Sequence, residues 1–272
     1  MTLVYAVLLG VIQWLTEFLP VSSSAHLILA RAFFGWDPEQ FGMAFDVACH
    51  VGTLIAVLVY FRPEVLAMIR AVPRLGTLLG DRPDPAAWMI LLLGVGTIPA
   101  VIVGVIFGKA IEGQLRRPEV AAVTLAVVAL AFFVVERYGA KQRTQSSLGI
   151  RDAVLIGCAQ ALALVPGVSR SGSTIATAMA LGMRRDESAR FVFVLGIPAI
   201  LAAAVKEGFP FMVHGLQPGE AGLFAAGIVS SAIVGYVAVR FFIRYVAGHS
   251  LAAFAWYRLA LAAAVVVWWF GR

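Results

Sequence analysis

Residues Glu17–His26 read EFLPVSSSAH and interrupt a chain that is otherwise strongly apolar. Of its 272 residues, 61% are hydrophobic and only 13% are charged, whereas soluble proteins carry about 25% charged residues. Long apolar runs without polar alternation predict membrane-spanning α-helices and exclude a β-barrel. The carboxylate, hydroxyls and imidazole of this stretch are therefore costly at membrane depth, which makes them candidates for function.

The apolar runs predict an all-α polytopic membrane protein with six transmembrane helices and two re-entrant hairpins. A spanning helix needs about 20 apolar residues. Six runs meet this requirement: Met43–Phe61, Ala86–Phe107, Val120–Val135, Phe191–Val205, Ala221–Val239 and Leu251–Phe270. Two pairs of shorter segments do not: Leu3–Leu19 with Ala25–Phe34, and Ala153–Val165 with Thr174–Met183. Each pair surrounds a helix-breaking polar turn, as in a re-entrant hairpin that lines a cavity.

The order of elements repeats along the chain. One hairpin and three spans occupy roughly residues 1–136, with the hairpin at 3–34, and the same order returns over 150–272, with the hairpin at 153–183. GVIQWLTEFLPVSSSAH from Gly10 resembles GCAQALALVPGVSRSGST from Gly157. Because each copy has an odd number of spans, the second copy is inverted. We expect a single integral membrane domain, 1–272, built as an inverted-topology repeat.

The basic residues predict the orientation of the chain. The net charge of +6 comes from residues between apolar runs, which favours membrane lipids or an anionic substrate as partners over nucleic acid. Thirteen Lys and Arg residues fall on one predicted side and six on the other. The richer side should be cytoplasmic, which places both termini outside and lets the two hairpin tips meet near the middle of the membrane.

The first hairpin tip carries a possible nucleophile and base. Gln13 and Glu17 share a helix face, and their oxygens suit a hard cation or the orientation of a base. The serines from Ser22 are either an N-cap or part of a reaction centre. His26 follows Ser22 by four residues and Ser23 by three, so its ring can approach either hydroxyl. A hydroxyl, an imidazole and a carboxylate form the pattern of an activated nucleophile.

The second tip, PGVSRSGST at residues 166–174, predicts an anion-binding site. We expect Ser169 to cap the following helix, whose first turn offers backbone N–H groups. Arg170 adds a planar donor that suits phosphate. The predicted phosphate contacts are Ser22, Ser169, Arg170, Ser171, Gly172, Ser173, Thr174 and Arg258.

Three other ionisable residues lie in or near the spans. Arg258 has no acidic neighbour in sequence, and we expect it to contact phosphate or to pair with an acid in the interior. Asp46 and His50 share a helix face, and we interpret both as ordinary membrane-interface residues.

Together, these motifs resemble the undecaprenyl-diphosphatase family, which is associated with bacitracin resistance. QWLTEFLPVSSSAH is similar to the family's first motif, and PGVSRSGST to its second. The near-terminal Tyr257–Arg258 pair and the order of elements extend the resemblance to almost the whole chain.

The resemblance implies a bacterial plasma-membrane enzyme that hydrolyses undecaprenyl diphosphate and recycles the lipid carrier for peptidoglycan synthesis. It implies catalytic roles for Glu17, Ser23, His26 and Arg170, with His26 as the base for Ser23. It also implies a divalent cation, Mg²⁺ or Ca²⁺, at Glu17 and Gln13. The active site should open toward the outer face, and a homodimer is possible.

Three alternatives remain at this point. A water molecule could attack phosphorus directly, with His26 or Glu17 as base. A flippase or anion transporter would also explain broken helices that meet at mid-membrane. A purely structural scaffold would leave the buried polar residues without a role.

Overall fold

The computed structural model describes most of the chain. Its backbone is described for residues 8, 11–12, 15–34, 43–214 and 220–270. The side chains of these residues are also described, apart from those of residues 31–34, 43–48, 112, 206–214, 220 and 270. Gln13, the side chain of Asp46 and both termini therefore lie outside the described residues.

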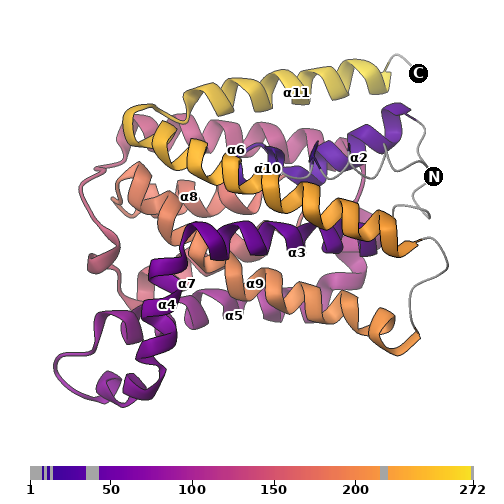
Figure 1. Cartoon of the computed structure of the whole chain (residues 1–272). Coiled ribbons are helices and arrows are strands. Elements are labelled where there is room, and N and C mark those ends of the chain that lie inside the picture. Colours follow the sequence, from indigo (N-terminus) through magenta and orange to yellow (C-terminus); the bar gives the residue numbers. More distant parts are fainter. Residues whose placement is uncertain (1–7, 9–10, 13–14, 35–42, 215–219, 271–272) are drawn as a thin grey trace.

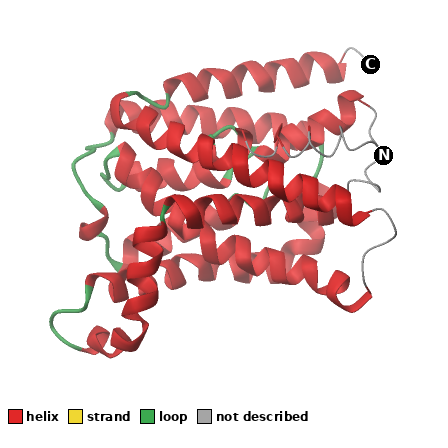
Figure 2. Cartoon of the chain, viewed as in Figure 1, coloured by secondary structure: helices red, strands yellow, loops and turns green. Residues whose placement is uncertain are grey.

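The described chain is helical throughout, with short connecting loops (Figure 2). A helical turn at residues 15–18 precedes the first named helix. The α-helices are α2 (Ser23–Phe34), α3 (Met43–Tyr60), α4 (Arg62–Ala71), α5 (Pro85–Ala110), α6 (Pro118–Tyr138), α7 (Ile150–Leu162), α8 (Arg170–Ala180), α9 (Arg185–His214), α10 (Glu220–Gly248) and α11 (Ala252–Phe270). The shorter helical segments are η1 (Val72–Leu79), η2 (Ile111–Leu115) and η3 (Gln145–Ser147).

The prediction of a protein with several membrane-spanning helices is confirmed, and five or six helices of the described chain can cross a bilayer. Within the described residues, α5, α6, α9, α10 and α11 each contain a segment that is long and apolar enough to cross a bilayer. α3 joins them only if it counts as one span together with α4 and η1, from which it is bent by 83°. The chain is thus a multi-pass membrane protein.

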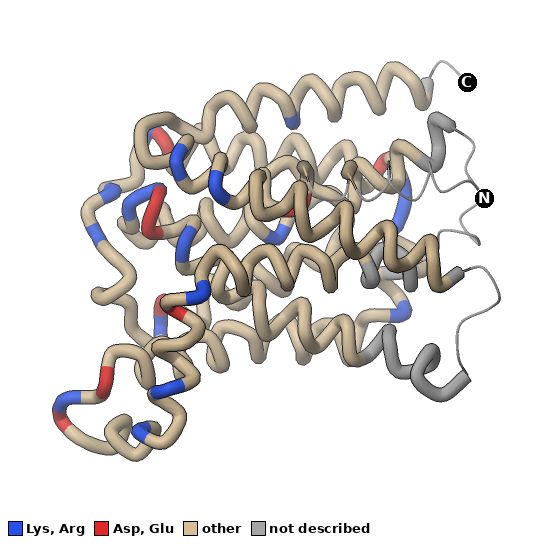
Figure 3. The backbone as a smooth tube through the Cα atoms, viewed as in Figure 1, with Lys and Arg blue, Asp and Glu red and all other residues tan. Residues whose placement is uncertain are grey.

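The long helices form one bundle. α3 contacts both α9 and α10, while α6 lies beside α11 and α5 beside α7 (Figure 1). α4 leaves the bundle at one end. The basic residues gather mainly at this same end, with the connection from α6 to α7 (Figure 3). This uneven distribution matches the charge asymmetry read from the sequence.

Two short helices, α7 and α8, are joined by a turn in the part of the chain where the sequence predicts the second hairpin. α7 has 13 residues and α8 has 11, so neither has the roughly 20 residues that a span needs. The turn between them contains Pro166 and Gly167, and the φ angle of Gly167 is 89°. A side chain at Gly167 would collide with the backbone of Ala121 on α6, so glycine lets this tip lie directly against α6.

Aromatic packing holds the first tip against the bundle. The Phe18 ring is fully buried and lies 5.3 Å from the Phe193 ring of α9, edge to face. The Phe193 ring also packs against those of Phe61 and Phe242, at 6.4 and 5.6 Å. Such pairs add to the free energy gained by burial. Because Phe18 follows Glu17 directly, this cluster fixes the position of the carboxylate.

Candidate active site

The polar turns that precede α2 and α8, here called the two tips, have the same local backbone geometry. Ser22 and Ser169 both adopt positive φ angles, 74° and 71°, which are uncommon for residues other than glycine. Each serine side chain accepts a hydrogen bond from the backbone N–H three residues later, at Ala25 (3.4 Å) and at Gly172 (3.1 Å). The predicted N-cap at Ser169 is therefore confirmed, and Ser22 caps its helix in the same way. Ser23 and Arg170 consequently occupy equivalent places, each as the first residue of its helix.

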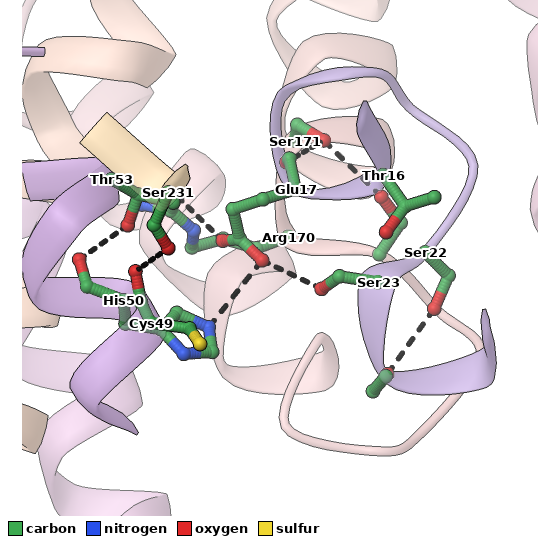
Figure 4. A network of polar contacts seen from close by, with 12 residues as sticks. Thr16, Glu17, Ser22, Ser23, Cys49, His50, Thr53, Arg170, Ser171 and Ser231 are labelled. Atoms are coloured by element: carbon green, nitrogen blue, oxygen red, sulfur yellow. Dashed lines mark hydrogen bonds and ion pairs between the residues drawn. The ribbon is translucent and has the colours of Figure 1, made fainter. Parts of the chain in front are cut away.

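Glu17 is the centre of the polar network between the tips (Figure 4). Its Oε2 accepts a hydrogen bond from the Ser23 hydroxyl at 2.6 Å. Its Oε1 accepts one from Arg170 Nη2 at 3.0 Å. The Glu17 residue is only 7% exposed. A carboxylate this deeply buried needs charged or hydrogen-bonded partners, and Ser23 of α2 and Arg170 of α8 supply them here.

Gly196 of α9 makes room for the Arg170 guanidinium. A Cβ atom at Gly196 would overlap Arg170 Nη1 and would lie 2.8 Å from its Cζ. Arg170 Nη1 is buried and has no hydrogen-bond partner among the described residues. The ion pair with Glu17 thus leaves donor capacity on the guanidinium, as an anion-binding arginine requires.

His50 belongs to this network, which corrects its interpretation as an interface residue. Its Nε2 lies 3.4 Å from Glu17 Oε2 (Figure 4). Since a carboxylate oxygen is an acceptor, the Nε2–H tautomer faces it. No local signal indicates this contact, because His50 is on α3 and Glu17 lies in the helical turn that precedes α2.

His26 is placed differently from the sequence prediction. Its Nδ1 lies 2.7 Å from the backbone oxygen of Ser22, and its Nε2 lies 2.7 Å from the Tyr257 hydroxyl on α11. Both ring nitrogens are therefore engaged away from the Ser23 hydroxyl. The predicted His26–Ser23 pair is wrong in this structure, and Glu17 is the group that contacts the nucleophile candidate.

Arg258 holds the two tips instead of facing a phosphate or an acid. The residue is fully buried, and its guanidinium donates to backbone oxygens of the first tip, the second tip and α6. The acceptors are Pro20 (3.1 Å), Gly167 (2.8 Å), Val168 (3.3 Å), Leu125 (3.2 Å) and Thr124 (3.3 Å). The predicted phosphate contact of Arg258 is therefore wrong in this structure, where Arg258 joins the two tips and α6 through hydrogen bonds to their backbone oxygens.

Most hydroxyl groups among the predicted phosphate contacts also form hydrogen bonds within the fold. Ser171 donates to the backbone oxygens of Glu17 and Leu19, at 3.2 and 3.3 Å. Ser173 donates to the Ala159 oxygen at 3.0 Å, and Thr174 to that of Arg170. These three hydroxyls hold the second hairpin in place of the direct phosphate contact that the sequence predicted. The Gly172 N–H is likewise used by the Ser169 cap.

A pocket of about 550 Å³ joins the network to an apolar groove. Its polar lining consists of Glu17, Ser22, Ser23, Ser24, His50, Thr97, Gln160, Ser169, Arg170 and Arg116. Its apolar lining comes mainly from α5 and α9: Ala100, Val101, Gly104, Val105, Gly108, Ala199, Ile200, Ala202 and Ala203. Neither Arg258 nor Ser171, Gly172, Ser173 or Thr174 lines it. The arrangement suits an amphiphile with an anionic head and an apolar chain.

The donor set limits how a metal ion would be held. The described residues contain no cluster of three His, Cys, Asp or Glu side chains suited to a metal. Glu17 supplies one carboxylate in the pocket. Mg²⁺ commonly binds through one or two carboxylates together with substrate phosphates. The residues thus fit a cation shared with a phosphate substrate, and do not form a complete protein cage within the described chain.

Comparison with known proteins identifies the family. The family described as "Bacitracin resistance protein BacA" matches residues 6–264. The chain belongs to this family. The relatives that carry the name "Undecaprenyl-diphosphatase" include proteins from three bacteria. The protein from Rubrobacter xylanophilus is 47% identical over 263 residues, covering 97% of each chain. The protein from Geobacter sulfurreducens is 41% identical over 274 residues, covering 100% of each chain. The protein from Trichlorobacter lovleyi is 41% identical over 263 residues, which cover 96% of this chain and 94% of the relative.

The family match includes both tips and Arg258, since it runs over residues 6–264. The family resemblance read from the sequence is therefore confirmed. The sequence motifs predicted Glu17, Ser23 and Arg170 in one site, and the structure brings these three together. The motifs did not place His50 or Gln160 in the site, although Gln160 aligns with Gln13 in the two similar stretches of sequence.

Proposed function

We propose that this protein is an undecaprenyl-diphosphate phosphatase, which hydrolyses undecaprenyl diphosphate to undecaprenyl phosphate and inorganic phosphate. The observation that carries the proposal is the Ser23–Glu17–Arg170 network at the polar end of a pocket that continues into an apolar groove. The names of the full-length relatives agree with this chemistry.

The pocket suggests how the lipid binds. The diphosphate would lie at Ser22, Ser23, Ser169 and Arg170, and the prenyl chain would extend along the small residues of α5 and α9. Arg170 can neutralise phosphate oxygens with the donors that Glu17 leaves free. Such preorganised charge is the main aid that proteins give to phosphoryl transfer.

Glu17 is the base that the geometry favours. The Ser23 hydroxyl already donates its hydrogen to Glu17 Oε2 at 2.6 Å. As Ser23 Oγ bonds to the terminal phosphorus, Glu17 takes the hydroxyl proton, and the bond to the lipid phosphate oxygen breaks. Glu17 passes that proton to the departing lipid phosphate. Water then attacks the phosphoserine, regenerating Ser23 and releasing inorganic phosphate.

Direct attack by water is the competing route. In that case, Glu17 takes a proton from water, and Ser23 only orients the carboxylate. A phosphorylated Ser23, trapped by rapid acid quench, would support the covalent route. Substantial turnover in Ser23→Ala would support direct attack.

A divalent cation, Mg²⁺ or Ca²⁺, is part of the proposal. Glu17 would hold it together with the diphosphate, and Gln13 would add a neutral oxygen. When bound, the cation would neutralise charge on the phosphate oxygens. Dependence of activity on added metal after chelation tests this point.

The topology that we propose has six spans and two re-entrant hairpins in an inverted repeat. The matched φ angles and caps of Ser22 and Ser169 support the repeat. We place the basic end of the bundle in the cytoplasm of a bacterial plasma membrane, with the active site open to the outer face and both termini outside. Cysteine accessibility from each side of the membrane tests this orientation.

The cellular role follows from the reaction. Hydrolysis of the diphosphate would return the lipid carrier to peptidoglycan synthesis, and the family's description suggests a contribution to bacitracin resistance. Deletion of the gene should raise bacitracin sensitivity, and complementation with Ser23→Ala should fail to restore resistance.

The decisive experiment is phosphate release by protein purified in detergent, where transport is impossible. The wild type should release phosphate from a polyprenyl diphosphate in the presence of Mg²⁺ or Ca²⁺. Glu17→Gln and Arg170→Gln should each lose about 100-fold or more. Glu64→Gln and Arg184→Gln are matched controls, since both remove a residue from an ion pair outside the pocket. An inactive wild type would instead favour a transporter.

A further inference from the structure

Gln160 is a buried pocket residue that the proposed mechanism does not yet use. It is 3% exposed, lies near the end of α7, and lines the same pocket as Ser23 and Arg170. Close contact between α5 and α7 determines its position. A Cβ atom at Gly157, three residues earlier, would lie 2.5 Å from the backbone oxygen of Gly96. Glycine there lets Gln160 reach α5.

One side of the Gln160 amide is fixed by α5. Its Nε2 donates to the Gly96 oxygen at 3.3 Å. Rotating the amide by 180° would bring two acceptor oxygens together, so the orientation with Nε2 toward Gly96 is the favoured one. The other side therefore presents Oε1, which can only accept hydrogen bonds.

Gln160 Oε1 is buried and has no hydrogen-bond partner among the described residues. A buried acceptor without a partner costs free energy, so such an atom points to a donor that arrives with the bound state. A prenyl chain and an ionised phosphate carry no hydrogen that they could donate. A water molecule does.

The end of α7 lies beside the phosphate-binding tip. The Ala159 oxygen, adjacent to Gln160 in the chain, accepts the Ser173 hydroxyl from the first turn of α8 at 3.0 Å. α8 begins at Arg170, whose Nη1 is also buried and without a partner in the described chain. One pocket thus combines an acceptor and a donor that have no partner in the part of the chain that the structure describes.

We propose that Gln160 Oε1 orients the water molecule that attacks phosphorus, a role that rests on the proposed phosphatase function. The water donates one hydrogen to Gln160 and gives its other proton to Glu17 as its oxygen bonds to phosphorus. In the covalent route, the phosphorus–oxygen bond to Ser23 breaks, and the serine oxygen takes the proton from Glu17. Gln160 itself exchanges no proton, because an amide oxygen is too weak a base.

The test compares Gln160→Met with the wild type in detergent, using a polyprenyl diphosphate and Mg²⁺. Methionine keeps the length and apolar volume but removes the acceptor. We expect kcat to fall about tenfold or more, as the loss of one well-placed hydrogen bond would produce, with KM for the lipid within twofold. Gln160→Asn, which withdraws the oxygen by one methylene, should show the same split if Gln160→Met does not fold.

Product partition gives a second measurement. With methanol present, the share of methyl phosphate relative to inorganic phosphate should rise in Gln160→Met. Methanol has a single O–H hydrogen, which goes to Glu17, so its attack depends less on the Gln160 acceptor than the attack of water does. The control is Gln142→Met, since Gln142 is exposed and outside the pocket. Its kcat and product ratio should match the wild type.

Several results would overturn the role of Gln160 while leaving the proposed function intact. One is an active wild type with an unchanged kcat in Gln160→Met. Another is a loss explained wholly by a higher KM or a higher Mg²⁺ requirement, which would assign Gln160 to lipid or cation binding. A wild type that releases no phosphate would instead overturn the phosphatase function itself.

Discussion

Glu17 and Arg170 are 153 residues apart in sequence, yet the Glu17 Oε1 atom accepts a hydrogen bond from Arg170 Nη2 at 3.0 Å. The side chains are 6% and 16% exposed, so the pair is largely shielded from water. A pair of this kind joins the two tips electrostatically. It also holds the candidate base beside the candidate anion-binding group.

Removing one member of this pair should destabilise the protein more than removing both. Glu17→Gln leaves the Arg170 charge buried without its carboxylate, which typically costs about 3–5 kcal/mol. Glu17→Gln combined with Arg170→Met should recover part of that loss in thermal unfolding, although activity stays absent. Strictly additive effects of the two single changes would show that the pair is not coupled.

Gly196→Ala should inactivate the enzyme by moving Arg170. The new methyl group would overlap the Arg170 guanidinium, and a displacement of about 1 Å in a reaction centre can cost about 100-fold in rate. Phosphate release is the measurement. Gly94→Ala on α5 is the control, because a Cβ atom there meets nothing within 4 Å. That variant should keep full activity and gain up to about 1 kcal/mol in stability.

Arg258→Met should destabilise the fold because it leaves carbonyl oxygens of both tips without their donor. A buried acceptor that loses its donor typically costs about 1–3 kcal/mol, and several carbonyl oxygens lose their donor here. Thermal unfolding in detergent measures the loss. Arg258→Lys keeps the charge but loses most of the fork of donors, so it should recover only part of the stability. If Arg258→Met unfolds like the wild type and only KM rises, a direct phosphate contact would be the better account.

His26 and Tyr257 should act as one unit. The rings are stacked at 5.7 Å, and the Tyr257 hydroxyl lies 2.7 Å from His26 Nε2. We therefore expect His26→Asn and Tyr257→Phe to cause similar losses of roughly tenfold or less, and the double variant to be no worse than either single one. A far larger loss in His26→Asn than in Tyr257→Phe would restore His26 as the catalytic base.

Asp152 should stabilise the basic end of the bundle in a pH-dependent way. A bidentate hydrogen bond from Arg143, at 2.7 and 3.2 Å, holds the pKa of the Asp152 carboxyl below its ordinary value of 3.8. A lowered pKa in the folded state means that this stabilisation is fully present above pH 3.8 and is lost as the pH falls below that value. Asp152→Asn should therefore lower the unfolding temperature at pH 7, and the difference should shrink at pH 3. An equal difference at both pH values would contradict the ionic origin.

The sequence by itself determined the local structure. Apolar runs of sufficient length predicted the five described helices that can each span a membrane by themselves. This was possible because the ability to span depends only on the composition and length of a single segment. Ser169 was placed correctly as an N-cap, since a cap bonds to a backbone N–H only three residues away. Glu17, Ser23 and Arg170 stood out because polar groups are costly in lipid.

Only the tertiary structure decided which of these groups meet. Residues four apart on a helix can face each other, and that spacing suggested His26 as the partner of Ser23. Tyr257, 231 residues away from His26, takes the ring instead, and Glu17 takes the serine. His50 and Arg258 likewise find their partners on other elements. Contacts between distant elements follow from how the helices pack together, and no local spacing encodes that packing.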